Sequence, residues 1–374
     1  MNNIFVIFLV LAVLLGVNFY IFFRLWHLVP AGSFYRMAVI AIGIFLVSSI
    51  FIGMLLGNVL PTIVAGTLYK IGTSWFIISV YVLMAFLLLD LLRITPLPMD
   101  KILFSNRLTF GVLAFVITSI MTFGYFNYKN KARVELSITI GAKDFSPLRI
   151  VALSDLHLGF TIGRSELEQW VELINRENPD IVLIAGDIID NHQKPLIEQD
   201  MASALRKIKS RYGVYACLGN HEYIGSMQQL GGMSGALEFF KNANITVLRD
   251  SAILLNNGVY IVGRDDFRVE NRKSLASLLK DLDRTKPVIL LDHQPFNLQE
   301  TAENFVDLQI SGHTHNGQIF PANLLVKRMY EIAHGYLQKD QSHIYVSSGM
   351  GIWGGKFRIG TKSEYVVINI SNQL

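Results

Sequence analysis

The chain has 374 residues, enough for two or three domains, and a formal net charge of +4. Residues 1–128 hold six of its 33 Lys and Arg and two of its 29 Asp and Glu, so residues 129–374 are formally neutral. The positive charge therefore comes from the apolar N-terminal part, and nucleic-acid binding is not expected. The one cysteine, Cys217, excludes a disulfide within the chain.

Residues 1–128 contain four apolar runs, each close to the ~20 residues that a helix needs to cross a hydrocarbon core. A soluble helix is rarely apolar on all sides over such a length, so we predict four transmembrane helices. Their predicted ranges are 3–23, 37–60, 73–92 and 108–126. The first run lacks a preceding basic segment and a small-residue cleavage site. We therefore interpret it as a retained helix rather than a signal peptide.

The basic residues around these runs are distributed slightly unevenly. Five lie in loops on one side and four on the other, which by the positive-inside rule places both termini and the C-terminal domain outside the cytoplasm. The five are Arg24, Arg36, Arg93, Lys101 and Arg107, and the four are Lys70, Lys129, Lys131 and Arg133. Asp90, near the end of the third run, is interpreted as a solvated helix end beside Arg93 rather than part of an ion pathway.

Residues 129–146 are predicted to form a linker and a first strand, and residues 147–374 a separate domain. In this domain, apolar runs typical of buried strands, such as "LRIVALS" and "DIVLIAG", alternate with helical patterns. Its later part is richer in strands. This order predicts an α/β domain with either a mixed sheet or two packed sheets.

Polar side chains follow five of the predicted strands, at the end where α/β folds place ligands. They occur in "SDLHLG", "AGDIID", "LGNHEY", "LDHQP" and "SGHTHNG". The residues concerned are Asp155, His157, Asp187, Asn220, His221, His293, His313 and His315. A single Asp or His at a strand end is usually a turn or surface residue. Five such sites, several flanked by glycine, favour a shared metal site instead.

The types of ligand indicate which metals would bind. Carboxylate, imidazole and amide groups suit Mn, Fe, Co or Zn better than calcium. Seven of the eight residues, all except His221, are candidate ligands. Seven ligands exceed what one ion needs, so we predict two divalent metal ions that share a bridging Asp.

The order D-x-H, G-D, G-N-H, H and G-H-x-H over residues 147–374 resembles the calcineurin-like metallophosphoesterase superfamily. Within it, the chain is most similar to a membrane-associated bacterial branch of phosphodiesterases and UDP-diacylglucosamine pyrophosphatases. The resemblance implies a four-layer α-β-β-α sandwich. Asn316 stands where that branch usually has glycine, and asparagine tolerates the left-handed backbone angles that this turn requires.

The resemblance also assigns a role to each site residue. Asp155, His157 and His315 would hold the first ion, and Asp187 would bridge both. Asn220, His293 and His313 would hold the second, and Asn220 would also contact phosphate. A hydroxide between the ions would attack phosphorus in line, and His221 would protonate the leaving oxygen. For His221 itself, a role as a further ligand, or as a residue that supports the ligands, remains open.

We therefore expect a membrane-anchored phosphoesterase that hydrolyses a phosphodiester, phosphomonoester or pyrophosphate bond. Because tethering confines the active site near a membrane, a lipid-linked phosphorylated substrate is the accompanying hypothesis. The alternative is a catalytically silent membrane scaffold or sensor that binds a partner. The full set of ligand positions favours the enzyme.

Three further groups of residues are expected to have structural rather than catalytic roles. Glu222 is expected either at the loop surface or in support of the ligands. A solvated loop is expected for Asp190, Asn191 and His192, with a position at the rim of the site as the alternative. The glycine-rich segment 349–360 is expected to be a tight turn, with contact to the substrate as the alternative.

Overall fold

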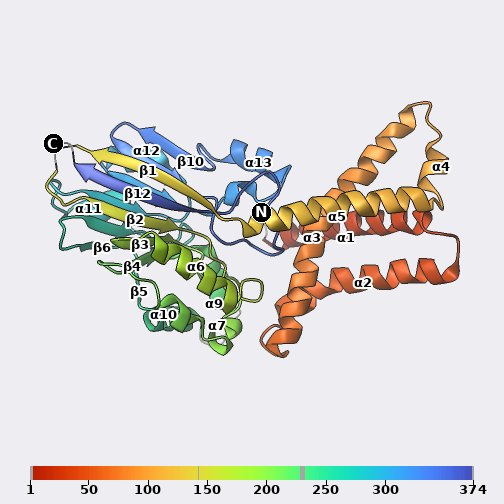
Figure 1. Cartoon of the computed structure of the whole chain (residues 1–374), viewed down its shortest axis with the longest axis horizontal. Coiled ribbons are helices and arrows are strands. Elements are labelled where there is room, and N and C mark those ends of the chain that lie inside the picture. Colours follow the sequence, from red (N-terminus) through yellow and green to blue (C-terminus); the bar gives the residue numbers. More distant parts are fainter. Residues whose placement is uncertain (1–2, 142, 228–231, 373–374) are drawn as a thin grey trace. The chain divides into compact units, whose positions relative to one another are not determined.

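The computed structural model describes residues 3–141, 143–227 and 232–372. The chain divides into two compact units, Met1–Tyr125 and Phe126–Leu374, which are considered separately below. Figure 1 shows the helical first unit in red to orange and the mixed second unit in yellow to blue.

The first unit consists of helices. They are α1 (Asn3–Leu28), α2 (Ser33–Leu55), α3 (Thr62–Leu91), the 3-10 turn η1 (Leu92–Ile94), α4 (Met99–Leu103) and most of α5 (Arg107–Lys129). Among the described residues, four helical segments are long and apolar enough to cross a membrane: Phe8–Leu28, Ser33–Leu55, Thr62–Ile94 and Arg107–Lys129.

The third helix begins at Thr62, so the predicted start at residue 73 is wrong. Lys70 was expected in the loop before this helix, but it lies within α3. Glycines allow α2 and α3 to pack closely. A Cβ on Gly72 would lie 2.5 Å from the Cα of Ile50, and one on Gly53 would lie 2.7 Å from the backbone nitrogen of Tyr69. Such close approach through glycine is a common way for membrane helices to associate.

Asp90 does not simply mark a solvated helix end, as the sequence suggested. Its carboxylate pairs with the buried guanidinium of Arg24 from α1 and accepts a hydrogen bond from Tyr20. Arg93, the predicted partner, lies 3.5 Å away. Asp90 therefore joins α3 to α1, which satisfies two charges in an otherwise apolar unit.

The second unit contains two six-stranded sheets. The first has the order β1 (Ala132–Ile140), β12 (Glu364–Asn372), β2 (Leu148–Leu153), β3 (Ile181–Ala185), β4 (Val214–Cys217) and β5 (Ile245–Val247). The second has the order β10 (Gly335–Lys339), β11 (Ser342–Val346), β9 (Leu308–Ser311), β8 (Val288–Leu291), β7 (Tyr260–Gly263) and β6 (Ser251–Leu254). Both sheets are mixed, and in each the three strands that lead into the site region are parallel: β2, β3 and β4 in the first, β7, β8 and β9 in the second.

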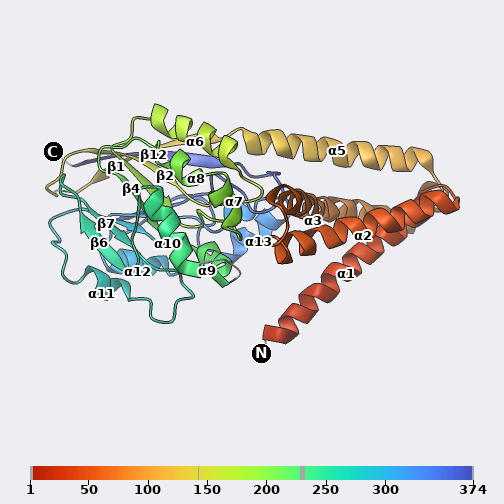
Figure 2. The ribbon, with the colours of Figure 1, turned by 90° about the horizontal axis from the view of Figure 1, so that it is seen from below.

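The helices of this unit are short. They are α6 (Arg164–Arg176), α7 (Lys194–Glu198), α8 (Met201–Leu205), α9 (Asn220–Met227), α10 (Gly232–Asn242), α11 (Leu275–Leu279), α12 (Leu298–Glu303), the 3-10 turn η2 (His315–Gly317) and α13 (Ala322–Met329). Figure 2 shows α6 on one side of the unit and α11 on the other.

Successive strand residues point to opposite faces, and this alternation builds two cores in the sandwich. Val182 and Ile184 of β3 pack under α6, α8 and α10, whereas Leu183 and Ala185 face the second sheet. A smaller cluster joins α11 to the outer face of β7 and β8. The layers are therefore helix, sheet, sheet and helix, which confirms the predicted four-layer α-β-β-α sandwich.

Candidate metal centre

The eight predicted site residues follow the ends of parallel strands at one edge of the two sheets. Asp155 and His157 follow β2, Asp187 follows β3, Asn220 and His221 open α9 after β4, His293 follows β8, and His313 and His315 follow β9. The carboxyl ends of neighbouring parallel strands meet at one edge, so residues up to 160 positions apart in the chain can meet there. The start of a helix at Asn220 was not predicted.

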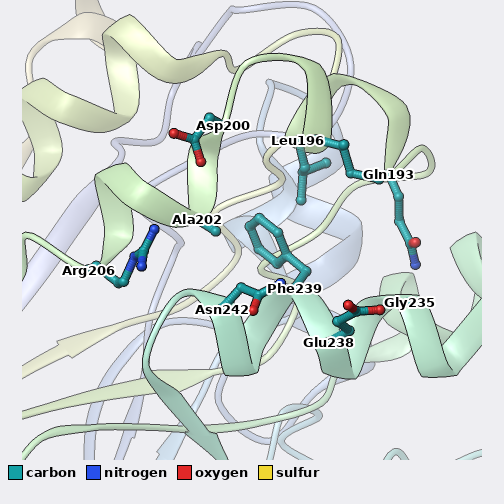
Figure 3. Close-up of a pocket in the computed structure, with 10 residues that line it drawn as sticks. Gln193, Leu196, Asp200, Ala202, Arg206, Gly235, Glu238, Phe239 and Asn242 are labelled. Carbon is teal, nitrogen blue, oxygen red and sulfur yellow. The ribbon is translucent and has the colours of Figure 1, made fainter.

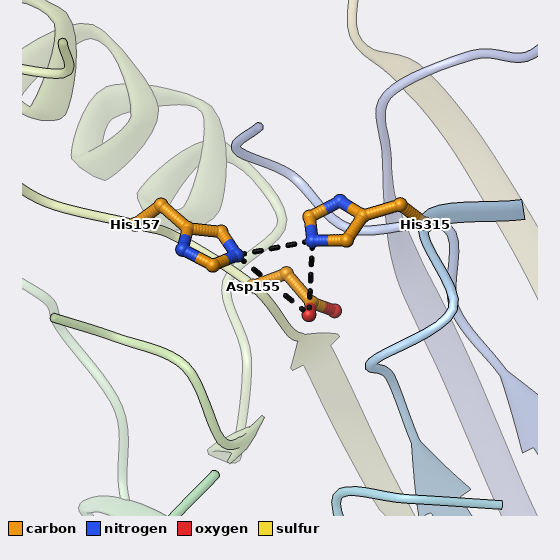
Figure 4. A group of neighbouring side chains, drawn as sticks. All are labelled: Asp155, His157 and His315. Atoms are coloured by element: carbon orange, nitrogen blue, oxygen red, sulfur yellow. Dashed lines mark hydrogen bonds and ion pairs between the residues drawn. The ribbon is translucent and has the colours of Figure 1, made fainter. Parts of the chain in front are cut away.

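The first group of converging side chains is Asp155, His157 and His315. The Nε2 atoms of His157 and His315 lie 3.0 Å apart, and the Nε2 of His315 lies 3.4 Å from Asp155 Oδ1. Figure 4 shows both imidazole rings and the carboxylate directed at one point. Asp155 and His157 are buried, and His315 retains a small exposure. Two imidazole nitrogens and a carboxylate oxygen aimed at one position form a donor set suited to a divalent transition metal.

The second group consists of Asp187, His293 and His313. The Nδ1 of His293 lies 2.7 Å from the carbonyl oxygen of Ala185 and donates to it, so its Nε2 presents a lone pair to Asp187 Oδ2 at 3.1 Å. A lone pair facing a carboxylate at this distance requires a proton or another cation between them. Burial disfavours charge on His293, but Asp187 outweighs it and raises the pKa of His293 to about 10. A metal ion fits the position of that proton.

Asn220 adds a second observation in favour of a metal. Its Oδ1 is buried and has no hydrogen-bond partner among the described residues. An orphaned buried carbonyl oxygen costs free energy, and an ion bound at this position would offset that cost. The next residue, His221, donates its backbone N–H to Asp187 Oδ1 at 2.8 Å, which holds this loop against the carboxylate.

His221 lies beside both groups. Its imidazole stacks edge-on against that of His157, with ring centroids 4.5 Å apart, and its Nδ1 is 3.3 Å from Asp190 Oδ1. The side chain is 14% exposed, more than the ligand candidates Asp155, His157 and His293, which are nearly inaccessible. Burial lowers the pKa of His221, but Asp187 and Asp190 together raise it to about 9. Without cations bound nearby, His221 would therefore carry a proton at neutral pH.

Asp190 and Glu222 are buried, so the prediction of a solvated loop at Asp190 is wrong. Burial raises the pKa of Asp190, but hydrogen bonds with His157 and His221 outweigh it and hold that pKa below its usual range. Glu222 accepts hydrogen bonds from the backbone N–H groups of Asp187, Ile189 and Gly219, at 3.1, 2.9 and 2.7 Å. It thereby ties the loop after β3 to the loop after β4. Burial and the nearby Asp187 raise the pKa of Glu222 to about 7.

The backbone at the site adopts conformations that are rare for residues with side chains. Asp155, His157, Asp187, His313 and His315 all have positive φ, between 47° and 70°. Such angles carry a conformational cost and tend to cluster at functional sites. Asn316 has φ of 50°, which confirms that this position needs a residue tolerant of the left-handed region.

Glycines at the strand ends make room for the carboxylates. A Cβ on Gly219 would lie 2.2 Å from Asp187 Oδ1, and one on Gly312 would lie 2.3 Å from Asp155 Oδ2. Any larger residue at either position would displace a predicted ligand. This explains why the motifs G-N-H and G-H-x-H both begin with glycine.

The glycine-rich segment 349–360 lies against the first group and is more than a turn between strands. Its Arg358 is fully buried and donates to the carbonyl oxygens of His315, Ser348 and Gly351 at 2.7, 2.5 and 3.0 Å. Sequence reasoning missed this role. The only signal was a cation within a run of glycines.

Replacing Arg358 with methionine is expected to weaken metal binding at the first group by about tenfold or more, since residues that orient ligands typically have effects of this size. Each carbonyl left without a donor should also cost about 1–3 kcal/mol of folding free energy. Calorimetric Mn titration and thermal unfolding would measure both. The matched control is Arg211→Met, at an exposed arginine before β4. Equal Mn affinity in the two variants would contradict the role assigned to Arg358.

A separate groove of about 430 Å³ lies between α7, α8 and α10. Figure 3 shows Leu196 and Phe239 directed into it, with Asp200, Arg206 and Glu238 around it. None of the eight predicted site residues lines this groove. It therefore plays no part in the metal centre.

Comparison with known proteins agrees with this arrangement. A family model described as calcineurin-like phosphoesterase matches residues 148–317. The chain is 33% identical over 274 residues to an uncharacterized metallophosphoesterase of Campylobacter jejuni, a match that covers 71% of each chain. The chain belongs to the calcineurin-like metallophosphoesterase family.

Two other relatives show how far the similarity extends. An uncharacterized metallophosphoesterase of Helicobacter pylori is 34% identical over 229 residues, covering 60% of each chain. A transmembrane protein with metallophosphoesterase domain from Danio rerio is 31% identical over 271 residues, covering 68% of this chain and 61% of the relative. The matches thus span less than two thirds of these two relatives. The narrower UDP-diacylglucosamine branch stays a prediction.

Proposed function

We propose that the chain is a membrane-anchored, dinuclear metal-dependent phosphoesterase. It hydrolyses a phosphodiester, phosphomonoester or pyrophosphate bond of a lipid-linked substrate. The observation that supports this most strongly is the convergence of Asp155, His157 and His315 next to Asp187, His293 and His313, each set within 4.8 Å.

In this proposal Asp155, His157 and His315 would hold one divalent ion, Asn220, His293 and His313 would hold the other, and Asp187 would be a ligand of both. Mn, Fe, Zn and Co all suit these ligands. When bound, the two ions would activate a water molecule as the nucleophile and neutralise charge on the phosphoryl oxygens. His221, held by Asp190, gives its proton to the leaving oxygen. Glu222 and Arg358 keep the ligand loops in place.

The four apolar helices and the relatives with transmembrane names associate the chain with a membrane. We further propose that the catalytic unit lies outside the cytoplasm, on the basis of the small difference in basic residues between the loops. A substrate that itself resides in the membrane would meet a tethered active site without diffusing through bulk water. No nucleic-acid partner is expected.

The first test is hydrolysis of bis(p-nitrophenyl) phosphate by the full-length protein in detergent, followed by a screen of lipid extracts. Activity should require added Mn and disappear on chelation, and the extract should lose a phosphorylated lipid with the wild type but not with Asp187→Ala. A purified chain that binds no divalent metal, or whose activity ignores chelation, would overturn the proposal. It would favour the scaffold or sensor alternative.

A further inference from the structure

An exposed apolar ridge lies on the second unit, close to the predicted metal centre. It consists of Phe320 and the α13 residues Leu324, Leu325 and Met329, all of which are exposed. Leu325 and Met329 are 66% and 72% exposed, and their spacing of four places them on one face of the helix. Large apolar side chains grouped in this way usually mark a binding surface.

The ridge is fixed firmly to the segment that carries His315. A Cβ on Gly317 would lie 2.4 Å from the Cα of Asn323, so α13 packs directly against the turn η2. The backbone N–H of Asn323 donates to the carbonyl oxygen of Ile319 at 3.1 Å. A molecule that binds the ridge is therefore held close to His315, a predicted metal ligand.

The ridge also adjoins the place where the last apolar helix ends. Asn127, near the end of α5, donates to the carbonyl oxygens of Arg358 and Thr361, both at 2.8 Å. Phe320 donates its backbone N–H to the carbonyl oxygen of Ile359, between those two residues, at 2.7 Å. The segment 358–361 therefore contacts both the end of a candidate membrane span and the start of the ridge.

Charge and aromatic residues extend the same surface. Lys327 and Arg328 are exposed at the end of α13, within one turn of Leu324 and Leu325. Tyr330, directly after the helix, stacks on Phe296 with ring centroids 5.3 Å apart. Both rings lie 6.3 Å from that of His313. Two aromatic rings therefore connect the end of α13 to His313, a predicted metal ligand.

We propose that the ridge lies in the surface of an anionic phospholipid bilayer. Apolar side chains would enter the boundary of the acyl chains, while Lys327 and Arg328 would meet phosphate headgroups, the combination typical of interfacial helices. The last residues of α5, which belong to the same unit as the ridge, favour a bilayer over other occupants, since they lead directly into a candidate membrane span. This proposal rests on the proposed function in one respect: it explains how a lipid-linked phosphate reaches His313.

The test is site-directed fluorescence on the full-length chain in nanodiscs that contain phosphatidylglycerol and doxyl-labelled phosphatidylcholine. A nitrobenzoxadiazole probe is attached in turn to Leu325→Cys, Met329→Cys and the control Phe305→Cys. Cys217 is buried, so the unsubstituted chain serves as the labelling blank. Phe305 is a matched control because it is 67% exposed but lies before β9, at the end opposite to the site.

We expect about twofold stronger quenching by doxyl lipid at positions 325 and 329 than at 305, because the ridge would lie at the acyl boundary. Equal quenching at all three positions would overturn the proposal. Disulfide cross-linking between two copies through position 325, without quenching, would also overturn it and indicate self-association. The probe does not depend on catalysis. An inactive protein with the expected quenching would refute the proposed function and leave the bilayer surface standing.

Discussion

Replacing Asp187 with asparagine is expected to reduce phosphoester hydrolysis by about a thousandfold or more. Metal stabilisation of phosphoryl charge is worth several kcal/mol, and each 1.4 kcal/mol corresponds to tenfold in rate. The carboxylate faces His293 of the second group at 3.1 Å and His157 of the first group at 3.9 Å, so it contacts both halves of the centre. Asparagine keeps the shape but removes the charge between two predicted cation sites.

The rate loss should be accompanied by a loss of bound metal, measured by elemental analysis of the purified variant. Asp283→Asn is the matched control, since Asp283 is exposed and its side chain contacts Thr285 in a surface turn. That variant should keep both metal content and rate. An Asp187→Asn protein that retains its metal and hydrolyses substrate normally would refute the bridging role.

The second large effect is expected at His221. If it donates the proton to the leaving oxygen, His221→Gln should slow hydrolysis of an alkyl phosphodiester by about 10²–10⁴-fold, the usual contribution of general acid catalysis. The loss should be much smaller for bis(p-nitrophenyl) phosphate, because p-nitrophenolate leaves without protonation. Comparing kcat/KM for the two substrates separates acid catalysis from metal binding.

The same assignment predicts a pH dependence. A general acid must be protonated, so the rate on the alkyl substrate should fall as pH rises through the pKa of His221. Asp187 and Asp190 raise that pKa to about 9, while cations bound at Asp187 oppose this shift and move the fall to lower pH. Asp190→Asn removes one of the two carboxylates and should move the fall lower by about one pH unit.

His221→Gln should remove this alkaline fall, and the p-nitrophenyl substrate should not show it. If the variant instead loses activity on both substrates equally, and loses its bound metal, His221 is a ligand. His221 also forms a possible ligand group with His157 and Asp187, so the comparison of the two substrates decides between acid and ligand.

The convergence of the predicted site residues could be anticipated from the sequence because the signal is local. Each residue directly follows a continuous apolar run, and such runs are typical of strands buried on both faces. Within one set of parallel strands the carboxyl ends lie along one edge, so residues that follow neighbouring strands are expected to lie together. The apolar helices were predictable for a similar reason, since composition alone distinguishes them.

Other features were missed because they depend on contacts between distant segments. Arg358 matters only because the carbonyls of His315, Ser348 and Gly351 surround it, and nothing near it in the sequence shows this. Asp190 and Glu222 resemble ordinary loop residues until the fold buries them. The early start of the third helix was missed because Lys70 was assigned to a loop, whereas it lies within the helix.

The central claim is that two divalent ions bind among these eight side chains. Anomalous diffraction from crystals of the full-length protein grown with Mn tests it directly. We expect two peaks, one contacted by Asp155, His157 and His315 and the other by Asn220, His293 and His313, with Asp187 between them. Absence of peaks in this region under saturating Mn, or peaks bound by other residues, would contradict it.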